Sequence, residues 1–243
     1  MYQPRTYRHW VKGDDLVSFS VVVKETDLYI RAASNLHRKA HRLVLKYRSS
    51  LEKYIARRPD FLTSLEPIEV EAEAPKIVRD MADAARMAGV GPMAAVAGAI
   101  AEFVGKELLD FSPEVIVENG GDIYLKIQRQ RTIGIFAGGS PLTGKLGLEI
   151  NPEDTPLGIC TSSGTVGHSL SFGRADAVIV LADSATLADA AATAIGNRVS
   201  EPADIEKGIE LARDIGQLRG VVIIKDDKLG VWGGVKIVPT QNE

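Results

Sequence analysis

The chain has only one cysteine, Cys160, among its 243 residues, which excludes an internal disulfide. It also lacks any apolar run long enough to cross a bilayer. The beginning of the chain, MYQPRTYRHWVKGDD, has neither the apolar centre of a signal peptide nor a lipidation motif. We therefore expect a cytoplasmic protein in a reducing compartment, with no membrane among its partners.

An excess of charge of one sign is also missing, since the formal net charge is −3 at pH 7. Such a chain has no overall attraction for nucleic acid, and we expect none as a partner. No linker rich in Pro, Ser and Gly divides the sequence, and no internal repeat is present. With 45% hydrophobic residues the chain can bury one full core, so we predict a single domain over residues 1–243.

Several signatures of nucleotide binding and catalysis are absent. Without G-x-x-x-x-G-K-[ST] or G-x-G-x-x-G, the sequence does not support a P-loop or a dinucleotide-binding Rossmann fold. Cys160, Ser162 and Ser163 lie near His168, which could act as a base for a nucleophile, but no G-x-S-x-G surrounds the serines, and we discount this chemistry. No cluster of cysteines and histidines supports a zinc site.

Hydrophobic periodicity predicts an α+β protein with mixed or antiparallel sheets and packed helices. The expected strands are 16–23, 28–32, 115–117, 123–128, 131–136, 145–150, 157–160, 177–182, 220–225 and 229–237. The expected helices are 36–55, 75–87, 93–109, 185–195 and 203–213. We expect strands 131–136 and 145–150 to extend the preceding meander, and the last two strands to form a terminal pair.

The predicted helix 36–55 and the residues just after it carry the only patch of one charge sign. Its basic residues are Arg38, Lys39, Arg42, Lys46, Arg48, Lys53, Arg57 and Arg58. Such a stripe usually indicates a solvated surface, and a phosphate-bearing ligand or partner is the alternative. His37 and His41 could bind a metal, but without a nearby carboxylate or cysteine ligand they are expected to be exposed members of the same face.

Two segments combine small and polar residues in ways that suit either a structural or a ligand-binding role. The alanines and glycine at the start of helix 93–109 would allow a phosphate at the helix N-terminus, or close helix packing. The sequence Asn119-Gly120-Gly121-Asp122 is a hairpin turn signal. With Glu118, its carboxylate would also suit a turn that contacts a ligand.

The strongest candidate site lies in residues 158–197. A hydroxyl-rich loop, Thr161-Ser162-Ser163-Gly164, precedes His168, and Asp189 and Thr193 follow one turn apart on one face of an alanine-rich helix. Carboxylate and hydroxyl oxygens suit a hard cation such as Mg²⁺ better than zinc. The alternative is a tightly packed core helix in which Thr193 bonds back to its own backbone.

In this order, the Asn-Gly-Gly-Asp turn, the Thr-Ser-Ser-Gly loop, the histidine and the Ala-Asp-Ala-Ala-Ala-Thr-Ala helix resemble the ApbE family of flavin transferases. The match covers about residues 88–197, and the chain looks closer still to an uncharacterised cytoplasmic family related to ApbE. The resemblance implies an ApbE-like α+β fold of two intimately joined lobes, with the ligand site between them. In ApbE proteins this site moves FMN from FAD to a threonine of a target protein.

The resemblance also implies roles for individual residues. Asp189 and Thr193 would hold a Mg²⁺ ion, with help from a backbone carbonyl among residues 95–97. FAD or a related nucleotide would be contacted by Asn119, Gly120, Gly121, Asp122, Thr161, Ser162, Ser163 and Gly164. His168 would be the catalytic residue that handles the proton.

The chain departs from the ApbE pattern at two places. It has Met93-Ala94-Ala95-Val96-Ala97-Gly98-Ala99 where that family has a lysine-bearing Gly-x-x-Lys-Gly segment, and Ser169 follows His168 in place of Asp-Pro. Three functions therefore stay open: Mg²⁺-dependent flavin or nucleotide phosphoryl transfer, flavin or nucleotide binding without turnover, and a structural role in a metabolic assembly. A homodimer is the default expectation for the oligomeric state.

Overall fold

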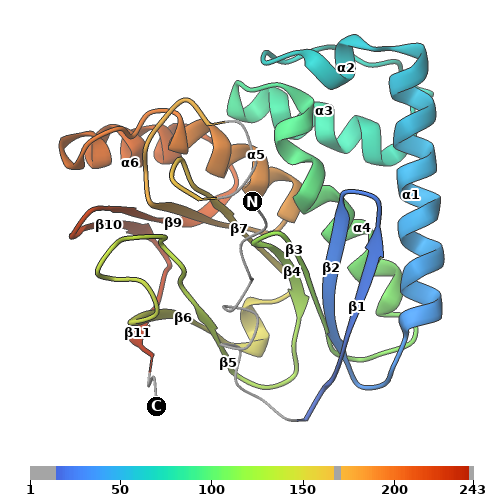
Figure 1. The fold of residues 1–243 in the computed structure, drawn as a ribbon, viewed down its shortest axis with the longest axis horizontal. Helices are drawn as coiled ribbons and strands as arrows, with labels where there is room; N and C mark the ends of the chain where they lie inside the picture. Colours follow the sequence, from blue (N-terminus) through green and yellow to red (C-terminus); the bar gives the residue numbers. More distant parts are fainter. Residues whose placement is uncertain (1–14, 167–170, 241–243) are drawn as a thin grey trace.

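A computed structural model describes residues 15–166 and 171–240 of the chain. These residues form an eight-stranded sheet, a three-stranded sheet and a set of helices packed on the large sheet (Figure 1). The large sheet has the strand order β1-β2-β3-β4-β7-β8-β9-β10, and the small sheet has the order β11-β6-β5. All neighbouring strands are antiparallel. The α+β fold with antiparallel sheets and packed helices, predicted from the sequence, is confirmed.

The bounds of the elements are as follows. The large sheet contains β1 (Val17–Val23), β2 (Thr26–Ala32), β3 (Val115–Asn119), β4 (Asp122–Lys126), β7 (Leu157–Ser162), β8 (Ala177–Ala182), β9 (Leu218–Lys225) and β10 (Lys228–Gly233). The small sheet contains β5 (Arg131–Gly134), β6 (Leu146–Ile150) and β11 (Ile237–Pro239). The α-helices are α1 (His37–Arg57), α2 (Asp60–Thr63), α3 (Lys76–Ala88), α4 (Val96–Leu108), α5 (Ala185–Gly196) and α6 (Ile205–Asp214). Three short 3₁₀ turns are η2 (Pro92–Ala95), η3 (Pro152–Asp154) and η4 (Pro202–Asp204).

The large sheet is the middle of three layers, with the helices on one face and the small sheet on the other (Figure 1). Its buried side chains accordingly fall into two clusters. On β8, Val178 and Val180 belong to the cluster beneath the helices, whereas Ile179 and Leu181 belong to the cluster between the sheets. Side chains alternate between the faces of a strand, so a strand covered on both faces is apolar throughout, as β8 is.

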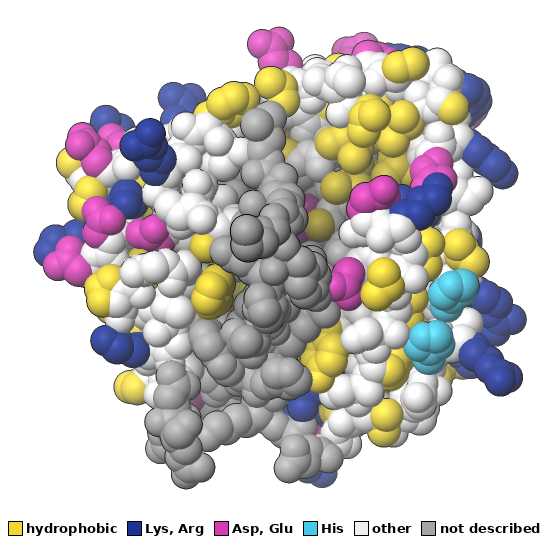
Figure 2. Space-filling model, viewed as in Figure 1, with side chains coloured by type: hydrophobic (Ala, Val, Ile, Leu, Met, Phe, Trp, Pro, Cys, Tyr) yellow, Lys and Arg dark blue, Asp and Glu magenta, His cyan; other side chains and the backbone are white. Residues whose placement is uncertain are grey.

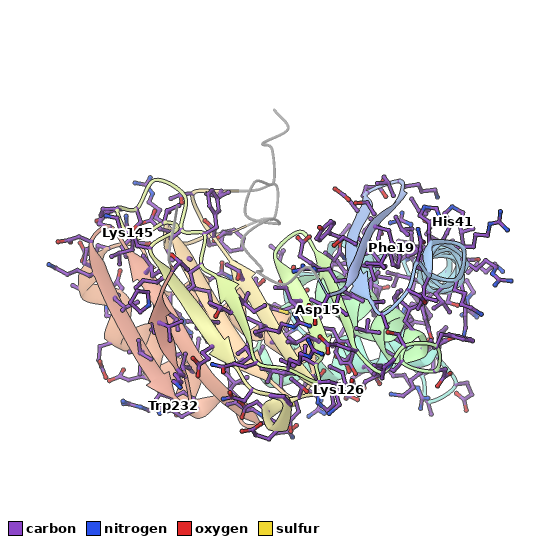
Figure 3. All side chains as sticks on the ribbon, turned by 90° about the horizontal axis from the view of Figure 1, so that it is seen from below. Asp15, Phe19, His41, Lys126, Lys145 and Trp232 are labelled. Carbon is purple, nitrogen blue, oxygen red and sulfur yellow. The ribbon has the colours of Figure 1, made fainter. Side chains whose placement is uncertain are left out.

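Helix α1 lies at one end of the large sheet and carries the basic stripe on its solvent side (Figures 2 and 3). Arg38, Arg42 and Lys53 are exposed, as expected for a solvated face. The rings of His37 and His41 stack with their centroids 6.4 Å apart. His37 is exposed and His41 is half-buried, and no group of three His, Cys, Asp or Glu residues that could hold a metal occurs in the described ranges.

Two predictions about strand pairing were wrong. Strands β5 and β6 do not extend the meander, because they stack on the large sheet as part of the small one. The segment predicted as one last strand, 229–237, is divided between β10 and β11, and β11 pairs with β6. The division falls at Gly233, where φ is +85° and a Cβ would lie 2.3 Å from the Arg219 carbonyl oxygen. Only glycine fits this turn, which directs the chain out of the large sheet.

Helices α3 and α4 follow each other closely, with only η2 and a short turn between them. Within the described ranges, no single helix is long and apolar enough to cross a membrane. Lys76–Ala88 and Pro92–Leu108 satisfy the length and composition criteria only together, as a pair bent by 106°.

Asp15 ties the start of the described chain to the small sheet. Arg131 on β5 donates to both of its carboxylate oxygens, at 2.7 and 2.8 Å, and this hydrogen bonding lowers the pKa of Asp15 to about 2. A carboxyl pKa lowered by folding stabilises the fold above the ordinary pKa of 3.8, and this contribution is lost as the pH falls through the folded value.

We expect Asp15→Asn to lower the urea midpoint at pH 7, with a difference from wild type that shrinks below about pH 4. An equal difference at pH 7 and pH 2.5 would show that the ion pair does not stabilise the fold.

Candidate functional site

The predicted turn and the predicted hydroxyl-rich loop lie side by side at the ends of the two central strands of the large sheet, β4 and β7. Strand register pairs Ile123 with Ile159, so the start of β4 lies beside the end of β7. A Cβ added to Gly121 would lie 3.9 Å from the Cβ of Thr161. Two segments that are separate in the sequence therefore form one surface.

Asp189 on α5 faces the first turn of α4. The N–H of Gly98 donates to Asp189 Oδ2 at 2.8 Å. A Cβ at Gly98 would lie 2.2 Å from the carbonyl oxygen of Ala185 and 2.8 Å from the Cβ of Asp189. Glycine alone allows the two helices to approach this closely, so the close-packing interpretation of the small residues in helix 93–109 is confirmed.

The β3–β4 turn is held against both α4 and β7. Asn119 Nδ2 donates to the carbonyl oxygen of Ala97 at 3.1 Å. The N–H of Thr161 donates to Asp122 Oδ1 at 3.2 Å, and the N–H of Gly121 donates to Glu118 Oε1 at 2.8 Å. The predicted hairpin turn is confirmed. Its side chains Asn119 and Asp122 connect it by hydrogen bonds to α4 and to β7.

Asp122 and Asp189 are close enough to influence each other's ionisation. Burial, followed by the charge of Asp189, raises the pKa of Asp122 well above its ordinary value. Burial also raises the pKa of Asp189 to about 7, although hydrogen bonds from the N–H groups of Gly98 and Ala97 lower it. Two neighbouring carboxylates repel each other when both are ionised, and a divalent cation beside them would relieve this repulsion.

Cys160 lies beside these carboxylates and is fully buried. Its Sγ donates to the carbonyl oxygen of Ala185 at 3.3 Å. Burial, followed by the charges of Asp122 and Asp189, raises the pKa of the thiol well above its ordinary value. A nucleophilic cysteine needs a lowered pKa, so the Cys160 thiol is suited to packing and not to attack.

The side chains of the predicted loop differ in how they are used. Ser163 Oγ accepts hydrogen bonds from the N–H groups of Thr165 and Val166, at 3.2 and 3.0 Å, and so shapes its own loop. Thr161 and Ser162 are half-buried, and Gly164 is exposed. A Cβ at Gly164 would lie 2.2 Å from the carbonyl oxygen of Gly173, so the chain passes close to itself there.

Thr193 follows Asp189 by one turn of α5. The alanines around both residues are buried, whereas Asp189 and Thr193 are half-buried. Ser184 caps the helix, as predicted, by accepting from the N–H of Leu187. The alternative prediction of a tightly packed core helix therefore holds for the alanines. Its other part does not hold, because within the described ranges the Thr193 hydroxyl makes no hydrogen bond back to its own helix.

The donor set suits a hard divalent cation. The carboxylates of Asp122 and Asp189 and the carbonyl oxygen of Ala97 lie together, and Thr193 is one turn of α5 beyond Asp189. All four offer oxygen donors of the kind that Mg²⁺ prefers. Cys160 lies beside the two carboxylates, but its thiol is held protonated by burial, and no group of three His, Cys, Asp or Glu residues that could hold a metal occurs in the described part of the chain, which disfavours zinc. These residues therefore fit the Mg²⁺ ion that the sequence predicted.

His168, the predicted catalytic residue, lies in 167–170, outside the described residues. The chain that follows this segment is held near the C-terminal end of α5. The N–H of Phe172 donates to Asn197 Oδ1 at 2.9 Å, and the N–H of Arg174 donates to the carbonyl oxygen of Val199 at 2.8 Å. The predicted role of His168 stays a prediction.

Comparison with solved structures defines the class of protein by its fold. The Flavin Transferase ApbE from Vibrio cholerae aligns over 91% of this chain and 97% of its own, with a TM-score of 0.59 and 14% identity. The flavinyl transferase ApbE from Pseudomonas stutzeri, in its apo form, aligns over 95% of both chains, with a TM-score of 0.57 and 15% identity. The chain therefore has the ApbE fold.

Sequence comparison identifies the family within this class. The family model described as AbpE bacteria matches residues 8–223, and the chain belongs to that family. The UPF0280 protein MJ1526 from Methanocaldococcus jannaschii is 45% identical over 221 residues, which cover 88% of this chain and 90% of that protein. A UPF0280 protein from Methanocella arvoryzae is 44% identical over 212 residues, which cover 87% and 86%. The predicted membership of an uncharacterised family related to ApbE is confirmed.

Proposed function

We propose that the chain binds an FAD-like dinucleotide together with Mg²⁺ and catalyses attack on its pyrophosphate. The observation that carries this proposal is the proximity of two carboxylates, Asp122 at the β3–β4 turn and Asp189 on α5, of which Asp189 accepts from the N–H of Gly98. The names of the structural neighbours, which are flavin transferases, favour a flavin as part of the ligand.

Each group in the site has a role in this proposal. Asp189, Thr193 and the carbonyl oxygen of Ala97 hold the cation, and Asp122 adds the second carboxylate. When bound, Mg²⁺ neutralises charge on the pyrophosphate. The turn at Asn119, Gly120, Gly121 and Asp122, together with Thr161, Ser162, Ser163 and Gly164, contacts the nucleotide. Gly120 is exposed and Gly121 has no side chain, so the ligand can approach the backbone closely.

The reaction class is phosphoryl transfer. A hydroxyl group, from a protein side chain or from water, attacks the phosphorus of the FMN half, and the bond to the AMP oxygen breaks. His168 accepts the proton of the attacking hydroxyl, and AMP leaves. Attack by a protein hydroxyl yields a flavinylated protein, whereas attack by water yields free FMN.

The release of AMP tests this function because both routes produce it. We expect the purified protein to form AMP from FAD in the presence of Mg²⁺, and to lose this activity when EDTA is added. Chromatography of the nucleotides measures the product, and the yield of free FMN distinguishes hydrolysis from transfer. Absence of AMP at millimolar FAD and Mg²⁺, with the protein folded, would contradict catalysis.

Ligand binding without turnover is the second candidate function, and one observation favours it. The segment Met93 to Ala99 lacks the lysine of the ApbE pattern, and the contact with Ala185 leaves no room for a side chain at Gly98. In that case FAD is retained by the protein, as measured by flavin fluorescence, without release of AMP.

A further inference from the structure

Glu102 on α4 is a buried carboxylate whose hydrogen bonds converge on the start of α5. Its exposed fraction is 3%. Oε2 accepts from Ser184 Oγ at 2.8 Å, from the N–H of Thr186 at 2.9 Å and from Thr186 Oγ1 at 3.0 Å. Oε1 accepts from Lys106 Nζ at 2.5 Å. One carboxylate thus satisfies three donors at the N-terminus of α5, where backbone N–H groups lack partners within the helix.

Glu102 and Gly98 join α4 to α5 at two successive turns. They are four residues apart and lie on the same face of α4. Gly98 contacts Asp189 through its N–H group, and Glu102 contacts the turn of α5 that precedes Asp189. The two contacts together oppose both sliding and rotation of α5, because either movement breaks a hydrogen bond to a buried group.

For stability, the buried N–H of Thr186 needs one acceptor, but Glu102 Oε2 also accepts from the hydroxyls of Ser184 and Thr186. The neighbouring buried positions of α4 are apolar: Ala99, Ala101 and Val104 are fully buried. Hydrogen bonds to a carboxylate are directional, so those of Glu102 fix the position of the first turn of α5 relative to α4.

We propose that Glu102 is a positioning residue that holds α5 in the register at which Asp189 and Thr193 can bind the cation. Glu102 acts through α5 and touches neither the cation nor the nucleotide. The inference rests on the proposed function, because the cation is the one assigned to the flavin site. It names a residue that the motif at Asp189 and Thr193 does not contain.

The test compares Glu102→Gln with Glu114→Gln, a matched control. Glu114 is also a buried carboxylate, with an exposed fraction of 5%. Its side chain accepts from Arg131 and from the N–H of Gln128, and neither residue belongs to α4 or α5. Both variants remove a buried charge and leave the shape of the side chain unchanged.

Two measurements are made on both variants and on the wild type. The affinity for Mn²⁺, used as a probe for a hard cation, is measured from the electron paramagnetic resonance signal of the free ion. Protection of the Gly98 amide is measured by hydrogen exchange, which reports the contact with Asp189 without any metal. We expect Glu102→Gln to weaken Mn²⁺ binding by about tenfold or more and to speed exchange at Gly98. Glu114→Gln is expected to keep both near wild type, although it lowers the urea midpoint.

The outcomes separate the inference from the proposed function. Wild-type Mn²⁺ affinity and Gly98 protection in Glu102→Gln would overturn the positioning role, as would equal changes in both variants. If the wild type binds no Mn²⁺, the proposed function fails, and Gly98 exchange alone decides whether Glu102 positions α5. Should Glu102→Gln not fold, the same two measurements are made on Thr186→Val, which removes the hydroxyl donor of Thr186 and retains the Glu102 carboxylate.

Discussion

Replacement of Asp189 by asparagine is expected to lower the rate of Mg²⁺-dependent AMP formation from FAD by about 100-fold or more. The amide keeps the shape of the side chain and can still accept from the N–H of Gly98. It removes the negative charge that attracts the cation, and an amide oxygen is a much weaker partner for Mg²⁺ than a carboxylate. Initial rates measured over a series of Mg²⁺ concentrations give the size of the loss.

Asp204→Asn is the matched control for this variant. Asp204 on η4 is also buried, and it accepts from the N–H groups of Ser200 and Glu201 and from Lys207, all away from the site. We expect this control to retain the wild-type rate. A rate near wild type in Asp189→Asn would show that Asp189 does not hold the catalytic cation.

Replacement of Gly98 by alanine is expected to lower the free energy of unfolding by about 3 kcal/mol. The new Cβ would lie 2.2 Å from the carbonyl oxygen of Ala185, and this neighbour is backbone, so it cannot move without shifting α5. The higher helix propensity of alanine, worth about 1 kcal/mol, offsets only part of this cost. Urea unfolding followed by circular dichroism measures the difference.

Gly216→Ala serves as the control for the effect of adding a methyl group. No heavy atom lies within 4 Å of the Cβ position at Gly216, and its φ is not in the left-handed region. We expect this variant to stay within about 0.5 kcal/mol of wild type. An equally small change in Gly98→Ala would contradict the close contact between α4 and α5.

Local features of the fold were predictable because they depend on neighbouring residues. Strand β8 (Ala177–Ala182) has the bounds predicted from its apolar run, and the cap at Ser184 follows from its side chain and the helix after it. Strands β5 and β6 were assigned to the wrong sheet. Alternating apolar residues show that one face of a hairpin is buried, but they do not show whether the hairpin pairs with the preceding sheet or stacks on it.

The candidate site was predictable only in part. The spacing of Asp189 and Thr193 indicated that both side chains could bind one cation. The resemblance to ApbE added the turn at Asn119 to Asp122 to the candidate site. The contact of Gly98 with Asp189 joins residues 91 positions apart, and nothing local distinguishes Gly98 from the small residues around it. Glu102 was missed because, with Lys106 four residues later, it has the pattern of an ordinary surface ion pair. The homodimer, the single domain and the cytoplasmic location stay predictions.

The central claim is that Asp122, Asp189 and Thr193 surround a site for a hard divalent cation. The most direct test is a titration of the protein with Mn²⁺, in which electron paramagnetic resonance measures the free ion. The titration is repeated in the presence of excess Mg²⁺. We predict saturable binding of one ion per chain, displaced by Mg²⁺ and lost in Asp189→Asn. Absence of saturable binding, or equal binding by wild type and Asp189→Asn, would contradict the claim.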